Sequence, residues 1–185
     1  MPAPAPPLLL TRPIVLVGLM GAGKTTVGRR LAQALAVPFR DADAEIEAAA
    51  NMRIADIFAI YGEAAFRDGE RKVIERLMGE RPHVLATGGG AFMNDATRAL
   101  VKAESTSIWL RASLDVLVKR TALRDTRPLL RDGDPREILG RLLKDREPVY
   151  ALADLAVDSA DGPHARTVER VLSALAAREQ DGVAV

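Results

Sequence analysis

The chain has 185 residues, 48% of them hydrophobic and 28% charged, with a formal net charge of +1 and no cysteine. These values are typical of one globular domain with a sizeable core, and the lack of cysteine excludes disulfides and cysteine-based metal sites. So small a net charge gives no reason to expect a nucleic-acid or membrane-surface partner, and no apolar run approaches the roughly 18 residues that cross a bilayer. We therefore expect a cytoplasmic protein with a single domain over residues 13–180, preceded by a disordered, Pro- and Ala-rich tail over residues 1–12.

The first predicted elements surround a glycine-rich turn. Residues 13–17 form an apolar run typical of a buried strand, and residues 26–36 carry apolar side chains at helical spacing. Between them, residues 18–25 read Gly-Leu-Met-Gly-Ala-Gly-Lys-Thr, which fits the pattern G-x-x-x-x-G-K-[ST]. In this context the backbone N–H groups and the helix N-terminus bind an anion, Lys24 reaches the β- and γ-phosphates, and Thr25 ligates Mg²⁺. The sequence thus predicts a nucleoside triphosphate site rather than a turn that binds nothing, with contacts from Gly21, Ala22, Gly23, Lys24, Thr25 and Thr26.

Further strands and helices alternate along the rest of the chain. The pattern predicts strands at residues 37–41, 83–87, 106–110 and 155–158, and helices at residues 43–50, 54–60, 63–78, 114–122 and 167–178. Such alternation predicts the α/β class, a three-layer sandwich in which a central five-stranded parallel sheet has helices on both faces. Ligands of these sheets bind beyond the carboxyl ends of the strands, so the residues that follow each strand should meet at one edge.

Carboxylates and glycines occur at that predicted edge. Asp41 and Asp43 end the second strand, and Gly88, Gly89 and Gly90 follow the third. A carboxylate near the γ-phosphate can orient an acceptor hydroxyl and accept its proton. If the strand continues to Asp43, both carboxylates point the same way, one toward Mg²⁺ and its waters and one toward the acceptor; alternatively, Asp43 caps the next helix. Three consecutive glycines favour close approach of a small ligand over a plain tight turn.

A polar stretch at residues 124–135 lies between two predicted helices. Loops of this length are usually functional or disordered. We expect the segment at about residues 122–136 to be a lid that closes over a bound nucleotide and excludes water.

The motifs, taken in order, resemble those of one family, shikimate kinase. They are residues 18–25, 39–47, 54–58, Gly62-Glu63, Phe66-Arg67, residues 88–90 and residues 127–130. The resemblance covers about residues 14–158, and its blocks beyond the phosphate loop are far more specific than that loop. It implies a P-loop NTPase fold of the nucleoside monophosphate kinase type. It also implies transfer of the γ-phosphoryl group of MgATP to the 3-hydroxyl of shikimate, in aromatic amino-acid biosynthesis.

The resemblance further implies roles on the nucleotide side. Lys24 and Arg127 would stabilise the transferring phosphate, and Arg120 would stack on adenine. Mg²⁺ would be held by Thr25 and, through water, by Asp41.

On the acceptor side, the resemblance implies a helical substrate-binding segment at about residues 43–80. Asp43 would accept the proton of the hydroxyl, and Arg67 and Arg146 would bind the shikimate carboxylate as a guanidinium fork. The ring would lie among the backbone of Gly88, Gly89 and Gly90 and the side chains of Phe58 and Phe66.

Two positions depart from the family pattern. Gly69 lies inside a predicted helix, where glycine is unfavourable, so we expect the helix to bend there. Residues 158–163 lack a basic residue that some relatives place beside adenine, so adenine contacts would come mostly from the backbone.

Three alternatives to a shikimate kinase account for fewer of these residues. A gluconate kinase would share the P-loop but would not need the Phe-Arg and Arg-Pro-Leu-Leu blocks. A nucleoside monophosphate kinase would need further arginines for the acceptor phosphate. A regulatory module that binds ATP without catalysis would not need Asp43, Arg127 or the glycine triplet. We expect a monomer whose partners are shikimate and ATP.

Overall fold

The computed structural model describes residue 8, residues 10–122 and residues 133–185. Its centre is a five-stranded sheet with the order β2-β3-β1-β4-β5, in which all pairs are parallel. The strands are β1 (Ile14–Val17), β2 (Phe39–Asp41), β3 (Val84–Ala86), β4 (Thr106–Arg111) and β5 (Leu155–Asp158). In the central register Leu16 lies between Ala86 on β3 and Ile108 on β4. The predicted α/β class and the predicted sheet are therefore confirmed.

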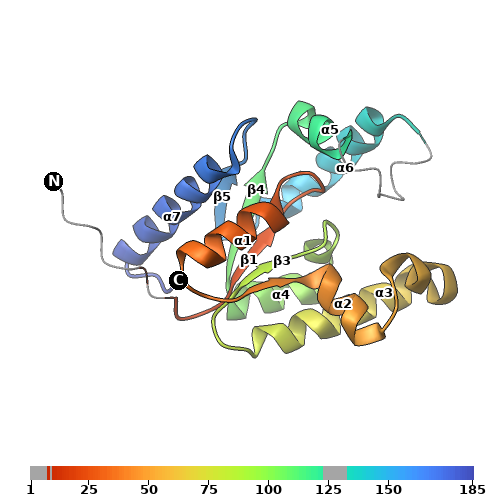
Figure 1. The fold of residues 1–185 in the computed structure, drawn as a ribbon, viewed down its shortest axis with the longest axis horizontal. Helices are drawn as coiled ribbons and strands as arrows, with labels where there is room; N and C mark the ends of the chain where they lie inside the picture. Colours follow the sequence, from red (N-terminus) through yellow and green to blue (C-terminus); the bar gives the residue numbers. More distant parts are fainter. Residues whose placement is uncertain (1–7, 9, 123–132) are drawn as a thin grey trace.

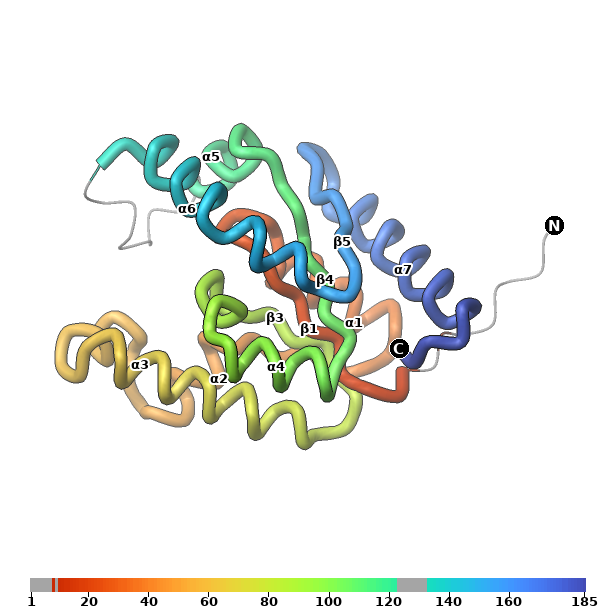
Figure 2. Tube along the Cα trace, turned by 180° about the vertical axis from the view of Figure 1, so that it is seen from behind, coloured from red at the N-terminus to blue at the C-terminus, as the bar shows by residue number. Residues whose placement is uncertain are grey.

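Helices cover both faces of this sheet. They are α1 (Lys24–Ala34), α2 (Ala42–Ala50), α3 (Ile54–Met78), α4 (Asp95–Glu104), α5 (Leu114–Ala122), α6 (Pro135–Tyr150) and α7 (His164–Gln180), with a short 3-10 helix η1 (Ala91–Met93). Helices α1 and α7 pack against each other on one face, and α4 and α6 lie on the other (Figure 1, Figure 2). The predicted three-layer arrangement is confirmed. No helix of the described part of the chain is long and apolar enough to cross a membrane.

The core follows from the position of β1. All four residues of this strand are fully buried, because helices cover it from both sides. A strand in that position reads as a continuous apolar run, which is the pattern that predicted it. Leu31 of α1 and Val171 of α7 complete the core on one face, and both are also fully buried. The phosphate loop begins at the carboxyl end of this buried strand.

Helix α3 consists of two pieces that meet at Gly62. This glycine has φ 80° and ψ 175°, the one non-helical conformation within Ile54–Met78. The separate helical segments predicted at residues 54–60 and 63–78 are thus confirmed. The bend expected at Gly69 is wrong, because the buried side chains Phe66 and Val73 hold that turn of the helix on the core. A positive φ of this kind needs glycine, which places the break at Gly62.

Helix α4 has no counterpart among the predicted elements. It begins at a capping residue, Asn94, whose side-chain oxygen accepts a hydrogen bond from the Thr97 N–H at 3.0 Å. Thr97 and Val101 are its buried residues and lie four positions apart. An asparagine cap followed by this spacing is a helix signal that could have been recognised.

The segment assigned to a disordered tail is in part held to the domain. Thr11 donates from its N–H and its hydroxyl to the carbonyl of Val185, at 2.7 Å and 2.9 Å, and Arg12 donates to the carbonyl of Ala103. The prediction of a tail over residues 1–12 is therefore wrong at these two residues, because these backbone and side-chain bonds tie them to the body. Residues 1–7 and 9 lie outside the described residues.

Candidate active site

The phosphate loop joins β1 to α1, and two of its glycines have positive φ angles that shape it. A Cβ atom added at Gly18 would lie 2.8 Å from the carbonyl oxygen of Leu110, and φ is +140° at this glycine. Gly23, with φ +98°, is the N-cap of α1 and offers no side chain there. Gly23 provides no side-chain cap, so the N-terminus of α1 adjoins the loop in which the motif predicts an anion.

Lys24 is folded back over this loop. Its side chain is buried, and Nζ donates to the carbonyl oxygens of Gly18 at 2.7 Å and Leu19 at 3.0 Å. The ammonium group therefore lies over the loop where the pattern expects phosphates. Carbonyl oxygens hold it there by charge-assisted hydrogen bonds, which a phosphate oxygen can replace.

Thr25 and Asp41 are in direct contact at the next step of the loop. The Thr25 hydroxyl donates to Asp41 Oδ2 at 3.0 Å, and Asp41 Oδ1 accepts from the N–H of Asp43 at 3.1 Å. One carboxylate thus orients the hydroxyl of α1 and also caps α2. A threonine hydroxyl beside a carboxylate is a donor set that suits Mg²⁺.

The N-cap of α2 is Asp41, which changes the predicted conformation of Asp43. Asp41 is the N-cap and Asp43 lies in the first helical turn, so the strand ends at Asp41 and does not continue to Asp43, and the capping alternative for Asp43 is wrong. The reason is local: once the Asp41 carboxylate accepts a backbone N–H, the helix begins at Ala42. Asp43 still points into the site, because a Cβ atom added at Gly88 would lie 3.2 Å from its Oδ1.

Four charged side chains converge on the glycine triplet after β3. A Cβ at Gly88 would lie 2.9 Å from Glu70 Oε1 as well as near Asp43, and one at Gly90 would lie 2.8 Å from both terminal nitrogens of Arg67. A Cβ at Gly89 would lie 3.6 Å from Arg146 Nη1. The charged residues are Asp43, Arg67, Glu70 and Arg146, from α2, α3, α3 and α6. A side chain at Gly88 or Gly90 would collide with these groups, whereas one at Gly89 would be in ordinary contact with Arg146.

Arg67 is held by carboxylates and aromatic packing. Its Nη1 donates to Glu70 Oε2 at 3.0 Å and its Nη2 to Glu63 Oε1 at 3.4 Å. The guanidinium carbon lies 5.2 Å from the centroid of the Phe66 ring. The Phe66 ring is buried and lies 4.6 Å from that of Phe58, which is partly exposed. Phe66 thus packs against Arg67, and Phe58 is the aromatic group nearer the surface; the contacts of both rings with the acceptor stay predictions.

Glu70 is a site residue to which the sequence assigned no role. It is 3% exposed, and its Oε1 has no hydrogen-bond partner among the described residues. Burial raises the pKa of this carboxyl, the charge of Arg67 opposes the rise, and the neighbouring Asp43 adds to it. The spacing of Arg67 and Glu70, three apart on a helix, was the available signal.

On the nucleotide side, Arg120 ties three segments together. Its guanidinium donates to the carbonyls of Gly21 and Ala22, to the hydroxyl of Ser159 at 2.9 Å, and to the carbonyl of Ala160 at 2.7 Å. Burial lowers the pKa of Arg120. The residue predicted to stack on adenine therefore lies beside the phosphate loop and the loop after β5.

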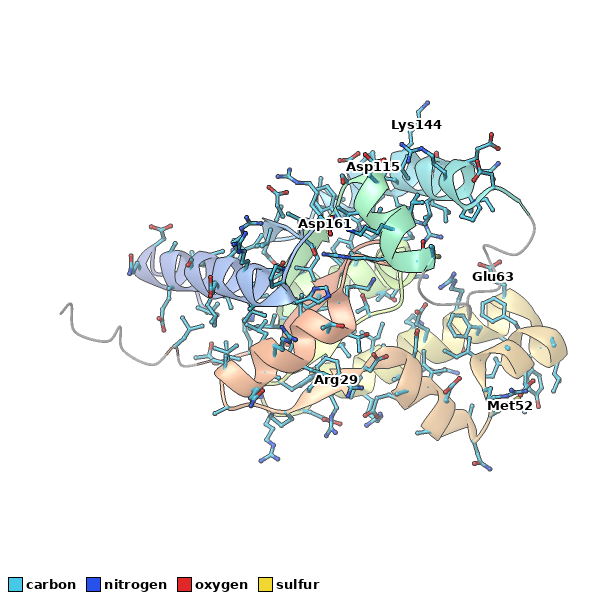
Figure 3. All side chains as sticks on the ribbon, turned by 45° about the horizontal axis from the view of Figure 1, so that its top comes forward. Arg29, Met52, Glu63, Asp115, Lys144 and Asp161 are labelled. Carbon is cyan, nitrogen blue, oxygen red and sulfur yellow. The ribbon has the colours of Figure 1, made fainter. Side chains whose placement is uncertain are left out.

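His164 also borders the phosphate loop and was not predicted. A Cβ at Gly23 would lie 3.1 Å from its Cε1. His164 comes directly after residues 158–163, which contain no basic residue. In Figure 3, Asp161 marks this nucleotide side and Glu63 on α3 marks the acceptor side.

The predicted lid lies mostly outside the described residues. The described residues do not include residues 123–132, so Arg127 is not among them. The described parts that flank this stretch are the end of α5 and the start of α6. The lid and the role of Arg127 stay predictions.

Known proteins match this chain over nearly its whole length. The shikimate kinase family model matches residues 20–176. Shikimate kinases of Paramagnetospirillum magneticum and Caulobacter vibrioides are 60% and 55% identical, over 89% and 90% of this chain and 84% of each relative. The structure of shikimate kinase from Acinetobacter baumannii in complex with shikimate has a TM-score of 0.87 at 36% identity, and the match covers 92% of this chain and 96% of that one. The chain belongs to the shikimate kinase family.

Proposed function

We propose that this chain transfers the γ-phosphoryl group of ATP to the 3-hydroxyl of shikimate, giving ADP and 3-phosphoshikimate. The observation that carries the proposal is the convergence of two arginines and two carboxylates on the glycine triplet, next to a phosphate loop. The two halves touch, because a Cβ at Gly89 would lie 3.6 Å from the N–H nitrogen of Met20. An acceptor on the triplet would therefore meet the γ-phosphate at close range.

The acceptor half suits a small polyhydroxy carboxylate. Arg67 and Arg146 face adjacent glycines, so both can bind one carboxylate, which prefers the planar guanidinium fork. The Asp43 carboxylate can accept a hydrogen bond from a ring hydroxyl. Glu70 holds Arg67 in place by accepting a hydrogen bond from its guanidinium group. Phe58 offers an apolar surface for the ring of the acceptor. The gluconate and nucleoside monophosphate alternatives are disfavoured by the family match.

The chemistry assigned to these residues is an in-line displacement. The 3-oxygen of shikimate forms a bond to the γ-phosphorus, the bond from that phosphorus to the β–γ bridging oxygen breaks, and Asp43 takes the hydroxyl proton. Lys24 neutralises charge on the transferring group, and Arg127 is proposed to do so from the lid at residues 122–136. Lid closure would exclude water, which would otherwise accept the phosphoryl group.

Thr25 and Asp41 are the residues proposed for Mg²⁺. The Thr25 hydroxyl would be a direct ligand, and Asp41 would hold it and a metal-bound water. When bound, the metal would neutralise negative charge on the phosphates. The contact of 3.0 Å between the two side chains supports this assignment.

Other expectations stay proposals. We propose a single kinase domain over residues 13–180, with residues 43–80 as the acceptor-binding segment. A monomer in the cytoplasm fits the small net charge of +1.

The experiment is an acceptor panel with coupled detection of ADP release. Shikimate, gluconate, AMP and no acceptor are compared at saturating MgATP, and the product is identified by mass. We expect ADP release with shikimate only, and no release with any acceptor for Lys24→Ala. Turnover of gluconate or AMP in place of shikimate would refute the proposal, and binding of ATP with no turnover would indicate a regulatory module.

A further inference from the structure

Tyr150, the last residue of α6, reaches across the molecule to the glycine triplet. Its hydroxyl donates to the carbonyl oxygen of Gly89, which is 61 positions away in the chain. The side chain is 1% exposed, so this is a buried phenol aimed at one backbone atom of the acceptor site. The hydroxyl is also hydrogen-bonded to the side chain of Arg146, and no role has been assigned to Tyr150 itself.

The Tyr150 ring is held by aromatic packing, which fixes the place of its hydroxyl between the Gly89 carbonyl and the Arg146 side chain. It stacks on Trp109 of β4, with ring centroids 6.1 Å apart and an interplanar angle of 28°. Trp109 is itself buried and lies 3.5 Å from where a Cβ of Gly18 would be. Burial raises the pKa of Tyr150, and Arg146, one turn earlier on α6, opposes the rise. The phenol thus stays protonated and can donate at neutral pH.

The Gly89 peptide needs such a restraint. Glycine rotates more freely than any other residue, and three in a row would allow this backbone several orientations. A peptide unit is planar and trans, so a bond that holds the Gly89 carbonyl also directs the Gly90 N–H to the opposite side. The same glycine borders the phosphate loop, since its Cβ would lie 3.7 Å from the Gly18 carbonyl oxygen. Tyr150 therefore acts where the acceptor half meets the nucleotide half.

We propose that Tyr150 is a positioning residue that sets the orientation of the Gly89–Gly90 peptide and thereby the position of the acceptor hydroxyl relative to the phosphate loop. This inference rests on the proposed function, because the acceptor is the one assigned there. It concerns the alignment of the reacting groups rather than the chemistry of the transfer.

The test is Tyr150→Phe, which keeps the ring and its stacking on Trp109 and removes only the hydroxyl. The matched control is Tyr61→Phe at the chain's other tyrosine, which is 62% exposed. For Tyr150→Phe we expect kcat with shikimate to fall by about 10- to 100-fold, the loss that a displacement of about 1 Å can cause. The KM for ATP should stay within about twofold because the P-loop contacts remain, and the control should match the wild type.

A second readout separates positioning from a loss of stability. The ratio of ADP released to shikimate phosphorylated should rise above that of the wild type, because a misplaced hydroxyl lets water accept the phosphoryl group. Partial unfolding would lower both quantities together and leave the ratio unchanged. Fluorescence of Trp109, the single tryptophan, reports whether the stacking is kept.

The outcomes distinguish this inference from the proposed function. If the wild type phosphorylates shikimate while Tyr150→Phe keeps kcat and the ratio, the positioning role is refuted and the function stands. If the wild type does not phosphorylate shikimate, the proposed function itself fails. If Tyr150→Phe does not fold, the role is tested in the wild type by the NMR resonance of the Gly90 amide. This resonance must shift when shikimate is added, and a constant resonance would refute the positioning role.

Discussion

The Thr25 hydroxyl donates a hydrogen bond to Asp41 Oδ2 at 3.0 Å, while the other oxygen of the same carboxylate caps the helix that carries Asp43. Asp41 therefore links the phosphate loop to the first turn of the segment that we propose binds the acceptor. A substitution at Asp41 should therefore change the Mg²⁺ dependence of activity more than it changes the free energy of unfolding.

Asp41→Asn tests the metal role. Asparagine is as good a helix cap as aspartate, so the melting temperature should change little. We expect the Mg²⁺ concentration for half-maximal activity to rise about 10- to 100-fold, as is usual when a carboxylate next to a metal ligand is lost. Activity is measured across a Mg²⁺ titration at fixed ATP. Asp56→Asn, on the exposed start of α3, is the control, and an unchanged Mg²⁺ requirement for Asp41→Asn would contradict the assignment.

Asp43→Asn tests the proton acceptor. The residue is exposed and does not cap α2, so its replacement should leave the fold intact. We expect kcat to fall by about 10²- to 10⁴-fold, the usual contribution of a general base, with unchanged affinity for a non-hydrolysable ATP analogue. Stopped-flow turnover and calorimetric titration measure the two quantities. A variant with near-normal turnover would exclude Asp43 as the base.

Gly90→Ala and Gly69→Ala compare the same methyl group in two places. At Gly90 it would lie 2.8 Å from the Arg67 guanidinium, a side-chain end that can move without unfolding the protein, whereas at Gly69 it would meet no atom within 4 Å. We expect Gly90→Ala to raise the KM for shikimate about 10- to 100-fold, matching the roughly 1.5–3 kcal/mol of a hydrogen bond to a charged group. Gly69→Ala should keep that KM and stabilise α3 by about 0.5–1 kcal/mol. Steady-state kinetics and denaturant unfolding measure both, and equal KM values in the two variants would argue against Arg67 as a ligand.

Glu70→Gln tests the buried carboxyl through pH. Because burial raises its pKa above the ordinary value of 4.5, the folded chain binds this proton more tightly than the unfolded chain does. The resulting stabilisation is complete below the unfolded pKa and is lost as pH rises through the folded pKa. Glutamine imitates the protonated form, so the melting temperature of the variant relative to the wild type should increase as the pH rises from below 4.5 through the raised pKa of Glu70.

The control for this experiment is Glu63→Gln. Glu63 is the second carboxylate beside Arg67, and its side chain is 69% exposed. It reports what the loss of a negative charge near Arg67 does by itself. A relative melting temperature for Glu70→Gln that is flat or falls with pH would show that the carboxyl is not destabilised by burial.

Local patterns predicted most of the fold. The apolar run of β1, the phosphate loop and the alternation of strands and helices each depend on neighbours in the chain, and all are confirmed. Predictions were weaker where two local signals competed. Asp41 and Asp43 both suit a helix cap, and only the hydrogen bond from the Asp43 N–H to the Asp41 carboxylate decided between them. Gly62 and Gly69 both suit a bend, and the buried side chains around Gly69 placed the break at Gly62.

The sequence by itself determined the family, the triphosphate loop and the identity of the charged groups, because each lies in a short contiguous motif. Tertiary structure alone decided which of these groups meet. Glu70 became a site residue only when α3 packed against the triplet after β3, and Tyr150 only when the end of α6 reached Gly89 from 61 positions away. A burial-raised pKa and a bond between distant residues arise from packing, which no short stretch of sequence encodes.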